Sequence, residues 1–90
     1  MSQQEPPKIE FPCQDYPIKV LGETGEEFVS LVHTVMNVHA GGYDISRTRI
    51  NVSSKGTFQA VTVFITATGV EQLQAIHDAL RHHRLVRMVM

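Results

Sequence analysis

The chain has 90 residues, 42% of them hydrophobic, and a formal net charge of −1, which is the composition of one globular domain. Its single cysteine, Cys13, excludes an intramolecular disulfide and fits a reducing cytoplasm. The longest apolar runs are a few residues, so no membrane span is expected, and the near-neutral charge weighs against a general binder of nucleic acid or membrane surfaces.

The charge is divided between the two halves of the chain. Residues 1–44 carry two bases and seven acids, for −5, and residues 45–90 carry six bases and two acids, for +4. This division has two interpretations: mutual attraction within one small fold, or a basic face that meets an anionic group.

The N-terminal part predicts a tail, a lead-in and a strand. Residues 1–8 are polar with paired prolines, which predicts a flexible tail ahead of a single domain over 9–90. Residues 10–15 predict an extended lead-in between prolines. Apolar and polar residues then alternate, which predicts a strand over 16–22.

A helix is predicted over 25–40 because apolar residues recur at helical spacing and stop at the pair Gly41-Gly42. Thr24 is the expected N-cap, and Glu27, three residues on, completes a capping box.

The hydrophobic period then changes to two and predicts strands over 46–53 and 58–67. In the first of them Thr48, Ile50 and Val52 are expected on the core face. In the second, the odd-numbered residues are expected to face the core and the even-numbered ones the opposite side.

A second helix is predicted over 69–82, with Thr68 and Glu71 as its capping box. A final strand is predicted over 85–90. One face of this strand is expected to carry Val86, Met88 and Met90.

The order of these elements predicts the fold. Two strand–helix–strand halves, each with a right-handed crossover, are typical of the α+β ferredoxin-like βαββαβ sandwich. A faint repeat agrees: Thr24-Gly25-Glu26-Glu27 and Thr68-Gly69-Val70-Glu71 stand 44 residues apart. We expect a four-stranded antiparallel sheet in the order 4-1-3-2 with both helices on one face.

No pattern of catalytic or cofactor-binding residues is found. The sequence has no phosphate-binding Walker loop, no nucleophile elbow and no dinucleotide fingerprint. Its five histidines lack metal-ligand spacing, and Cys13 has no evident activating base. The sequence therefore predicts a protein that is not an enzyme, with no catalytic residue, metal site or cofactor.

Nucleic-acid binding remains a less favoured alternative. Lys55-Gly56 match the start of the motif that RNA-recognition folds carry on their third strand. The motif needs aromatic residues at the positions on which bases stack. Here those positions hold Thr57, Gln59 and Thr62.

Two helices cover only one side of a four-stranded sheet, so the other side is expected to be open. Aromatic rings among cations suit an anionic group with an apolar body, such as a fatty-acyl carboxylate, or an acidic protein surface, and self-association as a homodimer is a further use. The alternative is that residues 9–15, with Ile9 and Phe11, fold back over this face. The residues expected on this open face are Lys19, Leu21, Arg47, Arg49, Phe58, Thr62, Phe64, Arg87 and Val89.

Several ordered motifs resemble the YbeD-like family of small bacterial proteins. They are Ile9-Glu10-Phe11-Pro12-Cys13 with Tyr16-Pro17-Ile18-Lys19-Val20-Leu21-Gly22, Ser53-Ser54-Lys55-Gly56-Thr57-Phe58, and Val86-Arg87-Met88-Val89-Met90. The resemblance covers residues 9–90. It implies a ferredoxin-like sandwich similar to ACT-type allosteric regulatory domains, and it carries by association a label as a lipoic-acid-binding regulatory protein.

ACT-type domains bind an amino-acid effector at a glycine-containing turn between the first strand and the first helix. By this resemblance Gly22, Thr24 and Gly25 are candidate ligand-binding residues, although the usual aspartate of that turn is absent; an ordinary capped turn is the alternative. The expected function is that of a cytoplasmic, non-enzymatic regulatory domain binding a small effector, related to lipoate by the family label, or a protein partner. The alternatives are a pure protein-interaction module without a small ligand, and RNA binding on the open sheet face.

Overall fold

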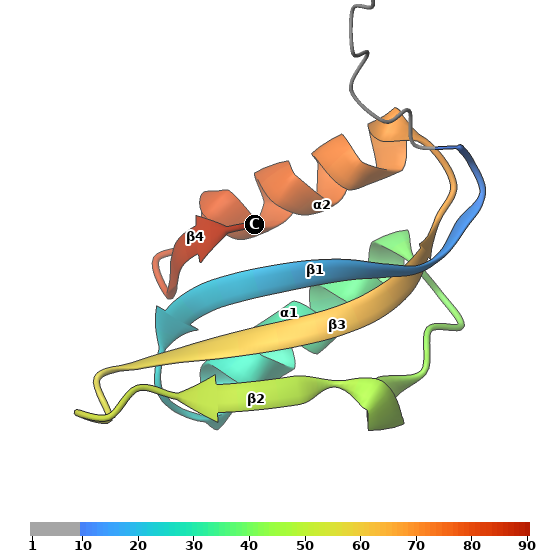
Figure 1. Cartoon of the computed structure of the whole chain (residues 1–90). Helices are drawn as coiled ribbons and strands as arrows, with labels where there is room; N and C mark the ends of the chain where they lie inside the picture. The colour runs from blue at the N-terminus through green and yellow to red at the C-terminus, as the bar shows by residue number, and fades with distance from the viewer. Residues whose placement is uncertain (1–9) are drawn as a thin grey trace, which may run out of the picture.

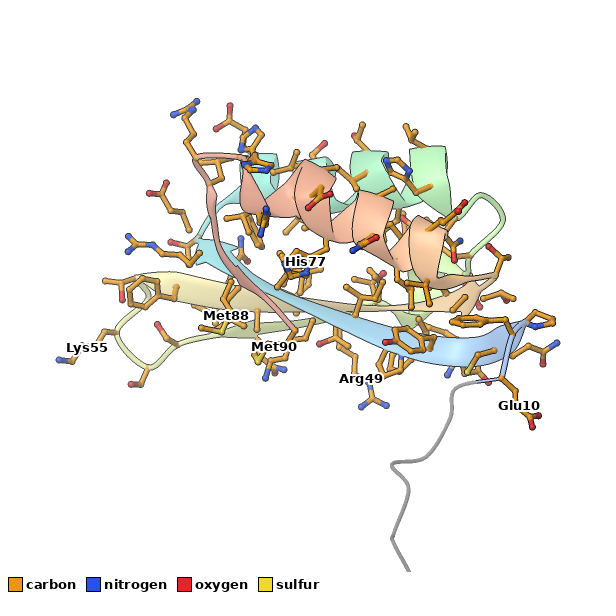
Figure 2. The ribbon with its side chains drawn as sticks, turned by 90° about the horizontal axis from the view of Figure 1, so that it is seen from above. Glu10, Arg49, Lys55, His77, Met88 and Met90 are labelled. Atoms are coloured by element: carbon orange, nitrogen blue, oxygen red, sulfur yellow. The ribbon has the colours of Figure 1, made fainter. Side chains whose placement is uncertain are left out.

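The computed structural model describes residues 10–90, so the predicted tail and Ile9 lie outside the described residues (Figure 1). A four-stranded antiparallel sheet in the order β2-β3-β1-β4 carries both helices on one side (Figure 2). This is the predicted order 4-1-3-2 seen from the other edge. The elements are β1 (Cys13–Glu23), α1 (Glu26–His39), a 3-10 helix η1 (Ile45–Arg47), β2 (Arg49–Val52), β3 (Phe58–Ala67), α2 (Val70–Arg81) and β4 (Val86–Val89).

The core lies between the two central strands and the helices. The odd-numbered residues of β3 are all buried, which confirms the period-two prediction for this strand. Each apolar side chain buried here contributes about 1.5–3 kcal/mol. The largest fully buried side chains are Phe28, Met36, Ile65, Ile76 and Leu80.

Strand β1 begins earlier than predicted. Cys13 already pairs with Ala67 of β3, so residues 13–15 belong to the sheet. Over these residues the chain continues β1 instead of folding back across the open face. None of the helices in the described part of the chain is long and apolar enough to cross a membrane.

Pro17 is tolerated inside β1 because β4 does not extend past it. Lys19 exchanges backbone hydrogen bonds with Met90, at 3.0 and 2.7 Å, so the alternating pattern of an antiparallel strand directs the nitrogen of Pro17 to the same edge. Within residues 10–90 no strand lies beside β1 beyond that pairing, so the missing N–H of proline breaks no ladder bond there.

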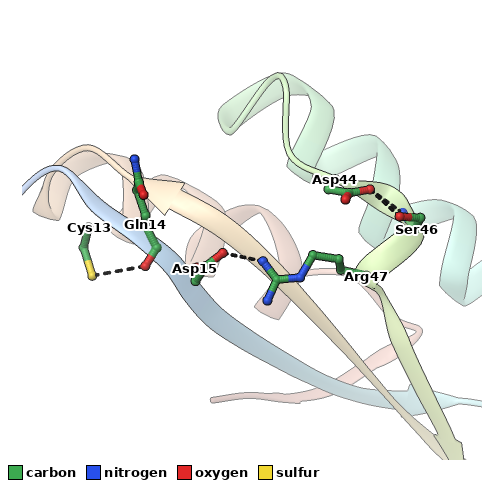
Figure 3. A network of polar contacts seen from close by, with 6 residues as sticks. All are labelled: Cys13, Gln14, Asp15, Asp44, Ser46 and Arg47. Atoms are coloured by element: carbon green, nitrogen blue, oxygen red, sulfur yellow. Dashed lines mark hydrogen bonds and ion pairs between the residues drawn. The ribbon is translucent and has the colours of Figure 1, made fainter.

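Strand β2 begins later than predicted and is exposed throughout. Residues 45–47 form η1, in which the Asp44 carboxylate accepts from the backbone nitrogen of Ser46 at 3.0 Å and from its hydroxyl at 2.6 Å (Figure 3). Ile50 and Val52 face the helix side, opposite buried positions of β3, but are 48% and 57% exposed. They lie on an edge strand that α1 does not cover, so the expected burial of this face is wrong.

Both predicted capping boxes are wrong. Helices α1 and α2 have Gly25 and Gly69 as their N-caps, and neither N-cap makes a side-chain hydrogen bond. The Thr24 hydroxyl instead donates to the Gly56 carbonyl at 2.9 Å, because the β2–β3 hairpin passes close by. At the start of α2 the acceptor comes from within the helix: Gln72 Oε1 receives the backbone N–H of Thr68 at 2.8 Å.

The face prediction for β4 is also wrong, because the pairing with β1 shifts register between Leu21 and Gly22. Val86 and Val89 pack against the core, and Met88 lies opposite Leu21 on the open face. Val89 was therefore expected on the wrong side of the sheet. The sequence pattern cannot show such a bulge, which changes the face of the residues on one side of it.

Candidate functional site

The turn between β1 and α1 is built from residues that the fold itself needs. Gly22 is buried, and a Cβ there would lie 1.9 Å from the ring of Phe28, so only glycine fits. Gly25 has φ +131°, a conformation that favours glycine. Two acidic residues, Glu26 and Glu27, form the first turn of α1 and make it less favourable for an anion.

Gln59 holds this turn in place. Its side chain is only 5% exposed, and its Nε2 donates to the carbonyls of Glu23 at 3.0 Å and Gly25 at 2.9 Å. Sequence reasoning missed this role. The available signal was a polar side chain at an odd, core-facing position of β3, where an apolar residue is the rule.

The open sheet face brings together most of the cations and aromatic rings expected there. The guanidinium carbon of Arg47 lies 4.7 Å from the centre of the Phe64 ring, and that of Arg49 lies 5.6 Å from it. The guanidinium carbon of Arg87 lies 5.0 Å from the centre of the Phe58 ring, which is 42% exposed as a residue. Phe58 and Phe64 thus each lie beneath at least one guanidinium group.

The three arginines differ in their acidic partners. Arg47 forms an ion pair with Asp15 of β1, which ties η1 to the N-terminal part of the sheet (Figure 3). Among the described residues, neither Arg49 nor Arg87 has a carboxylate within 4.0 Å. Figure 2 shows Arg49 projecting on the side of the sheet opposite the helices. Lys19 lies opposite Thr62 in the sheet, which places it on the same open face.

A shallow depression of about 180 Å³ lies beside Phe58 on this face. Leu21 and Ala60, which pair across β1 and β3, form part of its lining together with Asn51. An apolar hollow beside Phe58, over whose ring the guanidinium group of Arg87 lies, matches an anion that carries an apolar body.

A second hollow, of about 610 Å³, lies on the helix side between α1 and β2. Its apolar lining comes from Val29, Ile45 and Ile50, and Gln59 and His33 add polar groups. Nδ1 of His33 lies 2.6 Å from the hydroxyl of Tyr43, and burial lowers the pKa of His33 below its ordinary value of 6.5.

No group of three potential metal ligands occurs in residues 10–90. The thiol of Cys13 is half-buried and donates to the carbonyl of the adjacent Gln14, at 3.8 Å (Figure 3). The β1–α1 turn and the open sheet face are the two candidate binding surfaces that the sequence predicts.

Comparison with solved structures agrees with the fold. Protein HP0495 from H. pylori superposes with a TM-score of 0.75 at 15% identity, covering 100% of this chain and 93% of that one. The ACT domain from GTP pyrophosphokinase of Chlorobium tepidum superposes with a TM-score of 0.60 at 18% identity, covering 82% of this chain and 80% of that one. These likenesses show a shared ferredoxin-like, ACT-like fold.

Comparison with sequences shows the family. A UPF0250 protein of Pseudomonas aeruginosa is 52% identical over 86 residues, covering 96% of this chain and 92% of its own. A UPF0250 protein of Azotobacter vinelandii is 56% identical over 84 residues, covering 93% and 91%. The model of the family described as "Protein of unknown function (DUF493)" matches residues 6–90. This small bacterial protein therefore belongs to the DUF493 family, whose members include the UPF0250 proteins and which is the YbeD-like family that its motifs resemble.

Proposed function

We propose that the protein is a non-catalytic regulatory module of the cytoplasm that binds an anionic group with an apolar body on the open face of its sheet. The observation that carries this proposal is the state of Arg49 and Arg87. Each lies over a phenylalanine ring and, within residues 10–90, has no carboxylate within 4.0 Å. The ACT-like fold supports a regulatory role, since a regulatory domain binds and transmits without performing chemistry.

Stacking on a ring prepares an arginine for binding. A guanidinium group that stacks on a ring through its flat face keeps its N–H edge free, and this edge binds a carboxylate in a bidentate manner. Because the side chain is already held, less conformational entropy is lost when the anion arrives. The depression beside Phe58 then receives the apolar part of the ligand.

Two classes of ligand fit this chemistry. The first class is a small fatty-acyl carboxylate. Lipoate, from which the YbeD-like family takes its label, is a molecule of this class. An acidic protein surface is the second candidate, which would make the domain a pure interaction module. The turn of Gly22, Thr24 and Gly25, suggested by the ACT likeness, is the alternative position for a small effector.

The test is a titration with octanoate, lipoate and a glutamate-rich peptide, followed through backbone amide shifts in NMR. We expect amide shifts around Phe58 and Phe64. The Arg87→Glu variant should bind with an affinity lower by about tenfold or more, which corresponds to about 1.4 kcal/mol or more of binding free energy. Arg81→Glu is the matched control, since Arg81 is a half-exposed arginine on α2, in the helix layer.

Three results would contradict the proposal. One is equal binding by Arg87→Glu and the unchanged protein. A second is a set of shifts centred on Gly25, which would move the effector to the β1–α1 turn. The third is tight binding of single-stranded RNA with no response to octanoate, lipoate or the acidic peptide.

A further inference from the structure

The two edges of the sheet are protected very differently. One edge of the sheet is β4, whose pairing with β1 is interrupted by a register shift, and where β1 runs past β4 Pro17 removes a backbone donor; both features hinder the addition of another strand. At the other edge, β2 holds no proline, and no bulge interrupts its pairing with β3 (Figure 1). An unprotected edge strand is a template for pairing with another chain.

The backbone groups that face outward from β2 follow from its hydrogen-bond pattern. Ser53 N donates to Phe58 O at 2.8 Å, so alternation directs the backbone groups of Arg49 and Asn51 toward β3. The N–H and C=O groups of Ile50 and Val52 therefore point away from the sheet. They form one repeat of the pattern that an added strand would pair with.

The side chains of β2 divide into two kinds. On the helix side, Ile50 and Val52 are exposed, and Ile50 and Ile45 line the 610 Å³ hollow against Val29 of α1. On the open side lies Arg49, which has no carboxylate partner among the described residues. A strand added here would therefore meet an apolar groove on one face and a cation on the other.

We propose that an extended, acidic segment of a partner protein adds to β2 as a fifth strand. Its apolar side chains enter the groove between α1 and β2, and its alternating carboxylates lie beside Arg49. Main-chain hydrogen bonds provide affinity in this mode of binding, and alternate side chains provide specificity. This surface adjoins the depression beside Phe58, because Val52 lines that depression as well. The two proposals also share Arg49, so the test below separates them by backbone exchange along β2.

Charge favours such a partner over a second copy of this chain. The segment 45–57 contains the cations Arg47, Arg49 and Lys55 and no acid. Arg47 is already paired with Asp15, so pairing two copies through β2 would bring to one seam four cations that have no acidic partner among the described residues, Arg49 and Lys55 from each copy. An acidic strand neutralises this edge, since opposite charges across neighbouring strands stabilise the pair.

The test uses a capped synthetic peptide of alternating valine and glutamate, and amide hydrogen exchange measured by NMR on the full chain. We expect saturating peptide to slow exchange at Ile50 and Val52 by about tenfold or more, while Arg49 and Asn51, already bonded to β3, change little. A peptide with lysine in place of glutamate is expected to leave exchange unchanged.

Variants of the groove provide the second measurement. Ile50→Lys is expected to weaken peptide binding by about tenfold or more without unfolding the protein, because Ile50 is already half-exposed. Val38→Lys is the matched control, since Val38 is 73% exposed on α1 and does not line the groove. Val52→Pro removes an outward N–H without breaking a bond to β3.

Three outcomes would overturn the inference. If amide exchange at Ile50 and Val52 becomes slower as the protein concentration is raised without any peptide, the edge pairs with a second copy instead. Peptide-induced shifts around Phe58 and Phe64 with unchanged exchange at β2 would favour the open face instead and so separate this inference from the proposed function. If neither the glutamate peptide nor the lysine peptide slows amide exchange at β2, the inference that an acidic strand pairs with this edge is wrong.

Discussion

Replacing Gly22 by alanine tests whether the packing of β1 against α1 requires a residue without a side chain. The new Cβ would lie 1.9 Å from Cε2 of Phe28 and 2.4 Å from the carbonyl oxygen of Leu85. Carbon atoms pack at about 3.5–4.0 Å, so the ring would have to withdraw by about 1.5 Å or more. Phe28 is fully buried, and the Leu85 carbonyl accepts a hydrogen bond from Glu23 N at 3.1 Å, so both neighbours are held.

Two responses bound the cost in the free energy of unfolding. If the ring repacks where it is, overpacking costs about 1–3 kcal/mol. If the ring leaves the core, the loss is comparable to removing a buried phenylalanine, about 3–5 kcal/mol. We expect about 3 kcal/mol, where the two ranges meet. With a urea dependence of about 1–3 kcal/mol per molar, this lowers the unfolding midpoint by about 1–3 M.

The assay is urea unfolding followed by circular dichroism, with Gly41→Ala as the matched control. A Cβ at Gly41 meets only the Asn37 carbonyl at 3.6 Å, an ordinary contact, so we expect a change within about 0.5 kcal/mol. Combining Gly22→Ala with Phe28→Leu should cost less than the sum of the single changes, since both act on one contact. An unchanged midpoint for Gly22→Ala would refute this reasoning.

Three further predictions concern polar contacts inside the fold. Gln72→Ala should lower the free energy of unfolding by about 1–3 kcal/mol, because Gln72 accepts from Thr68 N and its Nε2 donates to the carbonyl of His39, the last residue of α1, at 2.9 Å. Thr68→Ala should be nearly neutral in the same chemical unfolding assay. A larger loss for Thr68→Ala than for Gln72→Ala would support the threonine as the helix cap. Gln59→Leu should cost about 1–3 kcal/mol because the two turn carbonyls lose the Gln59 donor, and a neutral result would contradict that role. Burial lowers the pKa of His33, so the folded state resists protonation and loses stability as pH falls from about 6.5 through the folded pKa. A pH series of urea midpoints should show a shallower decline for His33→Gln, and equal slopes would contradict this assignment.

The sequence by itself determined the order and type of the four strands and two α-helices, but not the 3-10 helix η1. Hydrophobic period depends on local geometry, two in a strand and 3.6 in a helix, so it can be read without knowing the neighbours. The same rule placed the odd residues of β3 in the core. It also placed Phe58, Phe64 and Arg49 on the open face, because a residue's side of the sheet follows from alternation once the covered face is known.

Only the tertiary structure decided which groups satisfy one another over long distances in the chain. Thr24 looks like a helix cap, but the hairpin brings the Gly56 carbonyl to its hydroxyl, 32 residues away. Gln59 reaches back 34 and 36 residues to hold the β1–α1 turn. The bulge in β4 reversed the side expected for Val89, since register depends on the partner strand.

The exposure of β2 was likewise decided by packing. Its alternation of apolar and polar residues is that of a half-buried strand, and the helix side of Ile50 matches the expected core face. Burial needs a helix above that face, and α1 lies over the central strands, leaving the edge strand uncovered. A sequence pattern states which side of a strand is apolar, whereas the position of a distant helix determines whether that side is buried against the core or left open as a groove.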